Sequence, residues 1–287
     1  MHSLKRIDLL FFSYLLISSL FLALSWDGST IFYSLVFIRI LLAPTLLAII
    51  YWGSKSKHPL INLLRNSYPL ILSGYFYSET VYYNKLLFNN IDPYLIAVEE
   101  GIFGMQASVE FSQYFSSPIF SELMYFSYFS FYLLIFSYVL VIYFQRREYF
   151  MEGLFNLSAS LYIFYLIFCI LPSAGPQFYF NAPENILPDA YLFGPLMHFI
   201  QDMAEQATGA FPSSHVGISV IILMLSKKSA PLFFKITLPL VILLILSTVY
   251  IKAHYAIDIL GGLLIAPIVL YLSKFLYHFS YFKSHKN

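Results

Sequence analysis

The chain has 287 residues, of which 59% are hydrophobic, 20% aromatic and 11% charged. A soluble domain carries about 25% charged residues, so this composition excludes an ordinary soluble globular protein and predicts an all-α, polytopic membrane protein. The net charge of +1 favours no particular partner, and we expect no nucleic acid among the partners. The single cysteine, Cys169, excludes an intramolecular disulfide and a multi-cysteine metal site, and its apolar surroundings predict a buried thiol.

The first apolar stretch follows Lys5 and Arg6 and runs for about 18 residues, which is long enough to span a bilayer. Small residues at 23–25 allow a cleaved secretory signal as an alternative, but the length favours a retained helix. Apolar windows predict eight membrane-spanning helices: 8–26, 30–52, 66–82, 119–144, 152–172, 211–226, 232–251 and 255–277. The third is the weakest of these predictions because it is rich in polar residues, and the sixth is short.

We expect six of these helices to form a catalytic bundle to which the first two add packing. Residues 1–65 then hold the two N-terminal transmembrane helices, and residues 66–287 form the catalytic membrane domain. Arg39 lies near the middle of the second helix, where a charge is costly in lipid. We therefore expect Arg39 to face the protein interior and pair with Glu79.

Basic residues alternate along the chain as the positive-inside rule describes. Of the 16 Lys and Arg residues, 13 flank the helix ends on one side: Lys5, Arg6, Lys55, Lys57, Arg65, Arg146, Arg147, Lys227, Lys228, Lys235, Lys274, Lys283 and Lys286. The opposite loops hold Lys85 and Lys252, which predicts that both termini lie in the cytoplasm. The compact loops favour a bacterial cytoplasmic membrane. Two long loops, 83–118 and 173–210, face the outer side, and loops of this length are usually functional or structured.

Two histidines and a carboxylate begin helices on this outer side. His215 begins the sixth predicted helix, and His254 and Asp258 begin the eighth. Because Asp258 follows His254 by four residues, both side chains lie on one helix face. A carboxylate there accepts a hydrogen bond from one ring nitrogen and leaves the other with its lone pair, which suits a nucleophile or a base.

The segment Pro212-Ser213-Ser214 opens the sixth helix, whose first N–H groups have no helical partner and favour an anion such as phosphate. Lys252 is the only cation close by in the sequence. The pattern predicts a phosphate ester held between a nucleophilic histidine and an acidic one. Alternatives for the histidines are packing within the spans and a zinc site with three visible ligands, but the two motifs on one side favour the phosphate site.

At these residues the chain resembles the type-2 phosphatidic acid phosphatase superfamily, whose three motifs are K-x6-R-P, P-S-x-H and S-R-x5-H-x3-D. The second motif matches residues 212–215, and the third matches residues 247–258 with Thr248 in place of arginine. The first motif is absent. Residues 209–217 and 247–262 are similar to the inositol phosphorylceramide synthase branch, an inositolphosphotransferase. Residues 172–177 resemble the P-x-x-G-P-R segment of bacterial relatives, with Gln177 in place of arginine.

The resemblance implies a role for each matched residue. His254 attacks phosphorus and forms a phosphohistidine, Asp258 orients it, and His215 protonates the leaving oxygen. Four residues are implied in phosphate binding: Ser213, Ser214, Lys252 and Gln177, the last two in place of the missing arginines. The family needs no metal, and we expect no cofactor.

The expected partners are a lipid phosphate substrate, membrane lipids and an acceptor for the phosphoryl group. Water as acceptor makes the protein a phosphatase, and a polyol or lipid hydroxyl makes it a phosphotransferase, for example of inositol phosphate. An outer-facing polyprenyl or phosphatidate phosphatase is one alternative. A non-catalytic membrane transporter or lipid-binding protein, which would tolerate loss of either histidine, is another.

Overall fold

The computed structural model describes residues 4–284, with side chains as far as residue 279, and this part of the chain folds without any β-strand. It contains a short 3₁₀ turn, η1, at Thr80–Tyr82 and twelve α-helices: α1 Arg6–Leu24, α2 Thr30–Lys55, α3 Pro59–Glu79, α4 Asp92–Phe103, α5 Ala107–Tyr114, α6 Pro118–Phe144, α7 Arg147–Ile170, α8 Pro176–Tyr179, α9 Phe193–Ala204, α10 Ser214–Ser229, α11 Pro231–Tyr250 and α12 Ala256–Ser284.

Each of the eight predicted spans corresponds to a helix, namely α1, α2, α3, α6, α7, α10, α11 and α12. Within the described residues, six of them are long and apolar enough to cross a membrane. The other two are α3, which is rich in polar residues, and α10, whose 16 residues fall short of the about 20 that a bilayer requires. The polytopic helical bundle is thus confirmed, and the two exceptions are the helices whose sequences gave the weakest signal.

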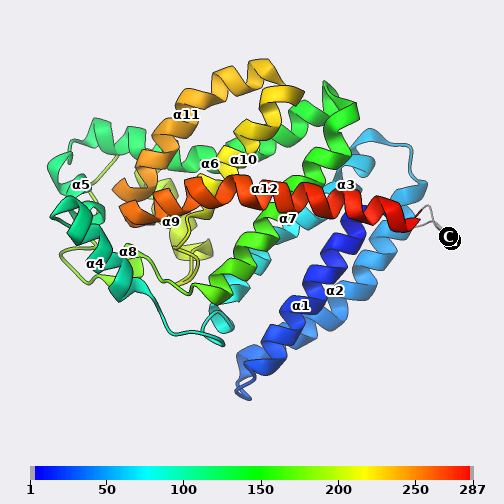
Figure 1. Cartoon of the computed structure of the whole chain (residues 1–287), viewed down its shortest axis with the longest axis horizontal. Helices are drawn as coiled ribbons and strands as arrows, with labels where there is room; N and C mark the ends of the chain where they lie inside the picture. Colours follow the sequence, from blue (N-terminus) through cyan, green and yellow to red (C-terminus); the bar gives the residue numbers. More distant parts are fainter. Residues whose placement is uncertain (1–3, 285–287) are drawn as a thin grey trace.

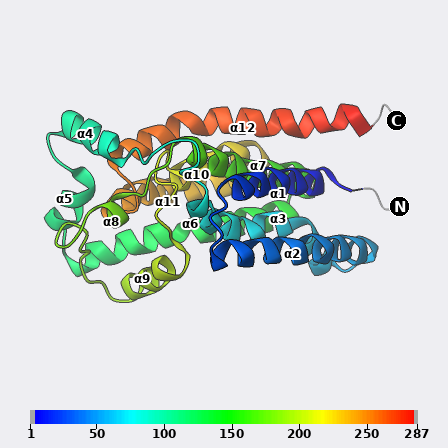
Figure 2. The same ribbon diagram turned by 90° about the horizontal axis from the view of Figure 1, so that it is seen from below.

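The short helices gather at one end of the bundle. Figures 1 and 2 show α4, α5, α8 and α9 at the end opposite to the two chain termini. They occupy the loops 83–118 and 173–210, so these loops are structured, as expected. Helix α10 begins beneath them and contacts α6, α7, α11 and α12, which places its first turn inside the bundle.

Helix α1 packs beside α3 and α7, helix α2 packs beside α3, and each is joined to α3 by a buried ion pair. Arg39 of α2 pairs with Glu79 of α3, which confirms that prediction. Arg65 of α3 pairs with Asp8 of α1, with 2.6 Å between Arg65 Nη2 and Asp8 Oδ2. The domain boundary predicted at residue 66 falls inside α3, which begins at Pro59.

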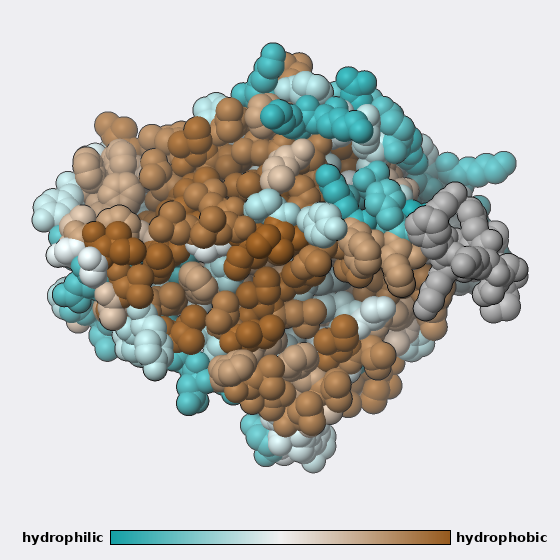
Figure 3. Space-filling model, viewed as in Figure 1, coloured by the Kyte–Doolittle hydropathy of each residue, from teal (hydrophilic) through white to brown (hydrophobic). Residues whose placement is uncertain are grey.

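The surface and the interior both match a membrane environment. The face drawn in Figure 3 is hydrophobic over most of its area, and its hydrophilic residues lie mainly along its margins. Leucine and isoleucine side chains are exposed along α1 and α2, where lipid replaces water as their neighbour. Inside, the Cys169 thiol is free and fully buried, as predicted.

We expect Arg39→Ala to lower the thermal unfolding midpoint of the purified protein in detergent. The substitution leaves Glu79 buried without its counter-charge, a situation that costs about 3–5 kcal/mol. The double variant Arg39→Met, Glu79→Met removes both charges and should unfold at a higher temperature than Arg39→Ala. If Arg39→Ala unfolds at the same temperature as the unmodified chain, the ion pair adds no stability.

Candidate active site

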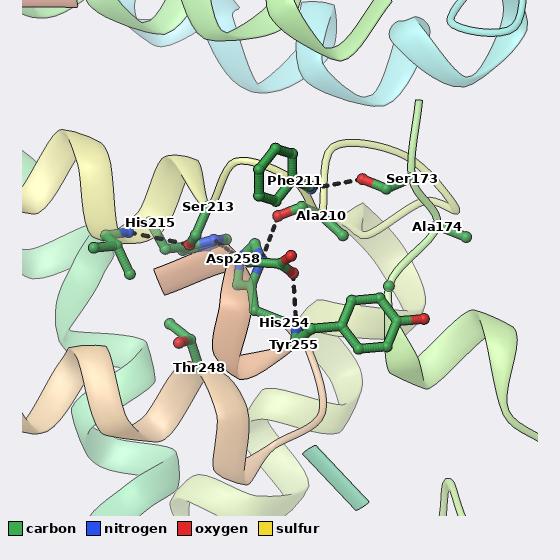
Figure 4. A network of polar contacts seen from close by, with 12 residues as sticks. Ser173, Ala174, Ala210, Phe211, Ser213, His215, Thr248, His254, Tyr255 and Asp258 are labelled. Carbon is green, nitrogen blue, oxygen red and sulfur yellow. Dashed lines mark hydrogen bonds and ion pairs between the residues drawn. The ribbon is translucent and has the colours of Figure 1, made fainter. Parts of the chain in front are cut away.

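Two histidines from different helices meet at the end of the bundle that carries the short helices. His215 lies in the first turn of α10, and His254 lies in the turn between α11 and α12. The Nδ1 atom of His215 is 3.2 Å from the Nε2 atom of His254. Figure 4 shows the two rings side by side, together with Asp258 from the first turn of α12. The structure therefore brings together the three residues that the motifs singled out.

The ring of His254 is held by a backbone carbonyl. Its Nδ1 atom is 2.8 Å from the carbonyl oxygen of Ala210, and 3.4 Å from Oδ2 of Asp258. A carbonyl oxygen can only accept, so Nδ1 carries the proton and Nε2 keeps its lone pair. The Nδ1–H of His215 then donates to that lone pair. The shorter contact thus comes from Ala210, where the sequence suggested Asp258.

Asp258 fixes the turn that carries His254. Its Oδ2 atom accepts a hydrogen bond of 2.8 Å from the backbone N–H of Tyr255, which holds the start of α12. Its backbone carbonyl accepts a bond of 3.2 Å from the N–H of Ser213, which joins α12 to the start of α10. Asp258 therefore sets the position of His254 through the backbone and makes a longer direct contact with the ring.

Ser213 caps the start of α10, whereas the resemblance implied that its hydroxyl binds phosphate. The hydroxyl of Ser213 accepts a bond of 3.3 Å from Val216 N–H and so caps the helix. The first helical hydrogen bond runs from Gly217 N–H to the carbonyl of Ser213. The N–H groups of Ser214 and His215 precede it, which leaves them without a helical partner and makes them candidates for binding an anion.

Lys252 does not reach this site. Its side chain is fully buried, and its Nζ atom donates to the backbone carbonyls of Ser108, at 3.3 Å, and Val109, at 2.8 Å. Burial lowers the pKa of its amine to about 8. The expectation that Lys252 replaces a missing arginine at the phosphate is therefore corrected: the turn directs its amine toward α5. Thr248 stands where the third motif has arginine, and its hydroxyl donates a hydrogen bond to the carbonyl of Ile245 in its own helix.

Asp92 is a buried residue of the site to which the sequence assigned no role. Its carboxylate accepts hydrogen bonds from the N–H groups of Ala174, at 2.7 Å, and Gly175, at 2.8 Å, and from the hydroxyl of Tyr255, at 2.8 Å. It thereby joins the segment after α7 to the turn that carries His254. Gly175 is required there because its φ is +91° and a Cβ atom would lie 2.9 Å from the carbonyl oxygen of Ala253.

Two cavities meet at the histidines. The first has a volume of about 590 Å³, is lined mainly by apolar side chains of α3, α6 and α7, and reaches His215. The second, with a volume of about 10 Å³, has room for about one water molecule and is lined by both histidines, Ser214 and Gln177. Glu205 lines both cavities, so it lies at their junction.

The environment of His254 favours its neutral form. Burial lowers the pKa of this ring from 6.5 to about 4, and the Ala210 bond and the charge of Glu205 oppose the shift only in part. At neutral pH the Nε2 atom therefore keeps the lone pair that a nucleophile requires. Within residues 4–284, no cluster of three or more His, Cys, Asp and Glu side chains is arranged to hold a metal ion.

Fold and site together define a class: a helical membrane protein with one buried and one half-buried histidine in contact beside a helix N-terminus and an apolar cavity. Comparison with known families agrees, because the model of the PAP2 superfamily matches residues 94–272. The chain belongs to the PAP2 superfamily, which confirms the family predicted from its motifs.

One curated relative is similar over a shorter segment. A PA-phosphatase related-family protein of Dictyostelium discoideum is 28% identical over 109 residues, which is 37% of this chain. The match spans only 20% of the length of that relative. No solved structure is significantly similar to the chain.

We expect Gly262→Ala to impair both activity and stability. A Cβ atom at residue 262 would lie 2.7 Å from the carbonyl oxygen of Ser213, so α12 must move away from α10 and part the two histidines. Overpacking of this kind costs about 1–3 kcal/mol, which a thermal unfolding midpoint measures.

Gly101→Ala is the matched control, because a Cβ atom on this residue of α4 has no neighbour within 4 Å and the residue lines neither cavity. It should leave the unfolding midpoint and the activity unchanged. Equal effects of the two substitutions would show that close approach of α10 and α12 is not what the site requires.

Proposed function

We propose that the protein is a membrane-embedded enzyme that cleaves a lipid phosphate ester through a phosphohistidine on His254. The observation that carries the proposal is the orientation of this ring: Nδ1 is bonded to the Ala210 carbonyl and Nε2 lies 3.2 Å from His215. Membership of the PAP2 superfamily suggests an activity of the phosphatase type on lipid phosphates. The geometry supports a two-step displacement with one histidine as nucleophile and the other as acid.

In the first step, Nε2 of His254 attacks phosphorus, a nitrogen–phosphorus bond forms, and the bond from phosphorus to the ester oxygen breaks. His215, protonated on both ring nitrogens once the anionic phosphate is bound, gives its Nδ1 proton to the leaving oxygen and becomes neutral. In the second step, a hydroxyl group attacks the phosphohistidine, the nitrogen–phosphorus bond breaks, and His215 takes the proton of that hydroxyl. Because the Ala210 carbonyl and Asp258 hold the other side of the His254 ring, it stays aligned through both steps.

The apolar cavity supports a lipid as substrate. It extends from α3 and α7 to His215, so acyl chains that fill it bring the phosphate of their head group to the histidines. The acyl chains of a lipid already lie in hydrocarbon, so the cavity contributes packing and positioning of the lipid and not a hydrophobic transfer from water. A non-catalytic lipid-binding protein requires the cavity but not the paired histidines.

The phosphate site itself favours a singly charged ester. Gln177, Ser214 and the N–H groups at the start of α10 are its proposed binding groups, while Lys252 lies elsewhere. We call the small cavity lined by both histidines the histidine cavity. No Lys or Arg is among the described residues that line it. Without a cation, a doubly charged monoester is poorly stabilised, so a phosphodiester is the preferred substrate.

A phosphodiester substrate makes transfer of a phospho-head group the leading reaction. The resemblance to inositol phosphorylceramide synthase suggests inositol phosphate as the group and a lipid alcohol as the acceptor. Hydrolysis of a polyprenyl phosphate or phosphatidate by water is the second candidate, favoured by the name of the Dictyostelium relative. The positive-inside pattern supports cytoplasmic termini and a site on the outer face of a bacterial cytoplasmic membrane. Residues 66–287 are the proposed catalytic domain.

We expect His254→Ala to abolish both turnover and covalent labelling by a lipid with a radioactive phosphate. His215→Ala should lower turnover by about 10²–10⁴-fold, because loss of a general acid slows the departure of the leaving oxygen. His58→Ala, at an exposed position before α3, is the matched control and should be fully active. Full activity of either site variant would favour the non-catalytic alternative.

The product then separates the two enzymatic reactions. The unmodified protein is incubated with labelled phosphodiester lipid, with and without an added lipid alcohol or polyol. A new labelled lipid that requires the added alcohol identifies a transferase, and release of a free phosphate compound with water alone identifies a phosphatase.

We expect the acid limb of kcat/KM to lie well below the ordinary histidine pKa of 6.5. His254 must be unprotonated to attack, and burial lowers its pKa to about 4, so activity persists as the pH falls through 6 and is lost as it approaches 4. A phosphodiester substrate is used because its own charge does not change in this range. Samples returned to pH 7 should regain activity, and an acid limb between pH 6 and 7 would contradict the burial argument.

A further inference from the structure

Glu205 is a buried carboxylate that the proposed mechanism does not use. It follows α9, is 9% exposed, and lies at the junction of the two cavities. Its Oε1 atom accepts a hydrogen bond of 2.8 Å from the hydroxyl of Tyr128, and its Oε2 atom accepts one of 2.5 Å from the amide of Gln177. The amide of Gln201 in turn bonds Gln177, at 3.0 Å. The carboxylate is therefore fixed in place beside the histidines.

The charge of Glu205 has no counter-charge from the protein. It is the only charged carboxylate or cation among the described residues that line the histidine cavity, and no described Lys or Arg forms an ion pair with it. A buried carboxylate is costly unless a positive charge or several hydrogen bonds compensate it. Its two oxygens have further lone pairs beyond the bonds from Tyr128 and Gln177. The site thus lacks one positive charge.

Aromatic rings stand beside this carboxylate. Tyr77 and Tyr128 line the same cavity, and the Tyr128 ring is also 4.7 Å, centroid to centroid, from the ring of His215. The face of an aromatic ring attracts a cation, most strongly where water is excluded. Glu205 also lines the larger cavity, together with Tyr77 and Tyr132, so a carboxylate with aromatic neighbours faces a space that can admit an ammonium group next to the place proposed for phosphate.

We propose that Glu205 binds the ammonium group of a zwitterionic phosphodiester lipid, whose phosphate lies at the histidines and the start of α10. The inference rests on the proposed function and replaces inositol phosphate by an ammonium-bearing head group as the preferred substrate. Such a head group supplies the missing positive charge, and its phosphate carries the single negative charge that the site tolerates. A phosphatidate, with two negative charges and no ammonium, is repelled by Glu205.

The test compares head groups in the full-length protein. Phosphatidylethanolamine, phosphatidylinositol and phosphatidic acid with identical acyl chains and labelled phosphate are assayed in mixed micelles. The variants are Glu205→Gln, which removes the charge but keeps groups that bond Tyr128 and Gln177, and Glu184→Gln, a control at an exposed position of the same loop. Thermal unfolding midpoints establish that each variant is folded.

We expect the unmodified protein to prefer phosphatidylethanolamine. Glu205→Gln should lower kcat/KM for this lipid by about 10- to 100-fold, as for loss of a hydrogen bond to a charged group, while activity on phosphatidylinositol stays the same or rises. Glu184→Gln should match the unmodified protein on every lipid. Selective loss for the ammonium lipid supports the proposal.

Two results overturn the inference while the proposed function stands: preference of the unmodified protein for phosphatidylinositol, or an equal change on all lipids in the folded Glu205→Gln variant. Absence of cleavage and of labelled His254 with every lipid overturns the proposed function and the inference with it. Binding of phosphatidylethanolamine in that case would be a property of a non-catalytic protein.

Discussion

The hydrogen bond between the His254 ring and the Ala210 carbonyl is the constraint on which the site depends. It sets which nitrogen carries the proton, and therefore which one faces His215. The bond exists only if the turn before α10 and the turn before α12 are held against each other. The Ser213 N–H to Asp258 carbonyl bond does this directly, and the carboxylate of Asp92 joins the second turn to the segment after α7. Three segments distant in sequence thus orient one ring.

Much of this arrangement could be predicted from the sequence, because its cause is local. Apolar periods and the bilayer thickness predict the eight helices, and alternation of charge predicts that His215 and His254 lie at one end. The Ala210 carbonyl could not be predicted, since every residue has a carbonyl and only the tertiary fold selects one. The direction in which the Lys252 side chain points also could not be predicted. It depends on the left-handed backbone of Lys252, whose φ is +61°, and motif spacing does not indicate this conformation.

The charges of the chain are divided between packing and chemistry. Arg39 binds α2 to α3 through its ion pair with Glu79. Arg65 binds α3 to α1 through its ion pair with Asp8. Lys252 is used to hold α5 against the turn before α12. The described lining of the histidine cavity is left with a single charged carboxylate and with uncharged donors. Sequence motifs gave the positions at which arginines are missing, but only the fold shows that no other cation replaces them there.

The contact between the two histidines has a consequence for which molecules can react. The Nε2 lone pair of His254, which we propose as the nucleophile, is already engaged by His215, and the space around it holds about one water molecule. An entering phosphate must separate the rings before chemistry can start. Acyl chains in the neighbouring cavity hold the phosphate of a lipid beside the rings at a high effective concentration, whereas a short, water-soluble ester has no such anchor. Under the proposed mechanism, the contact between the two rings therefore favours lipid esters over soluble phosphates.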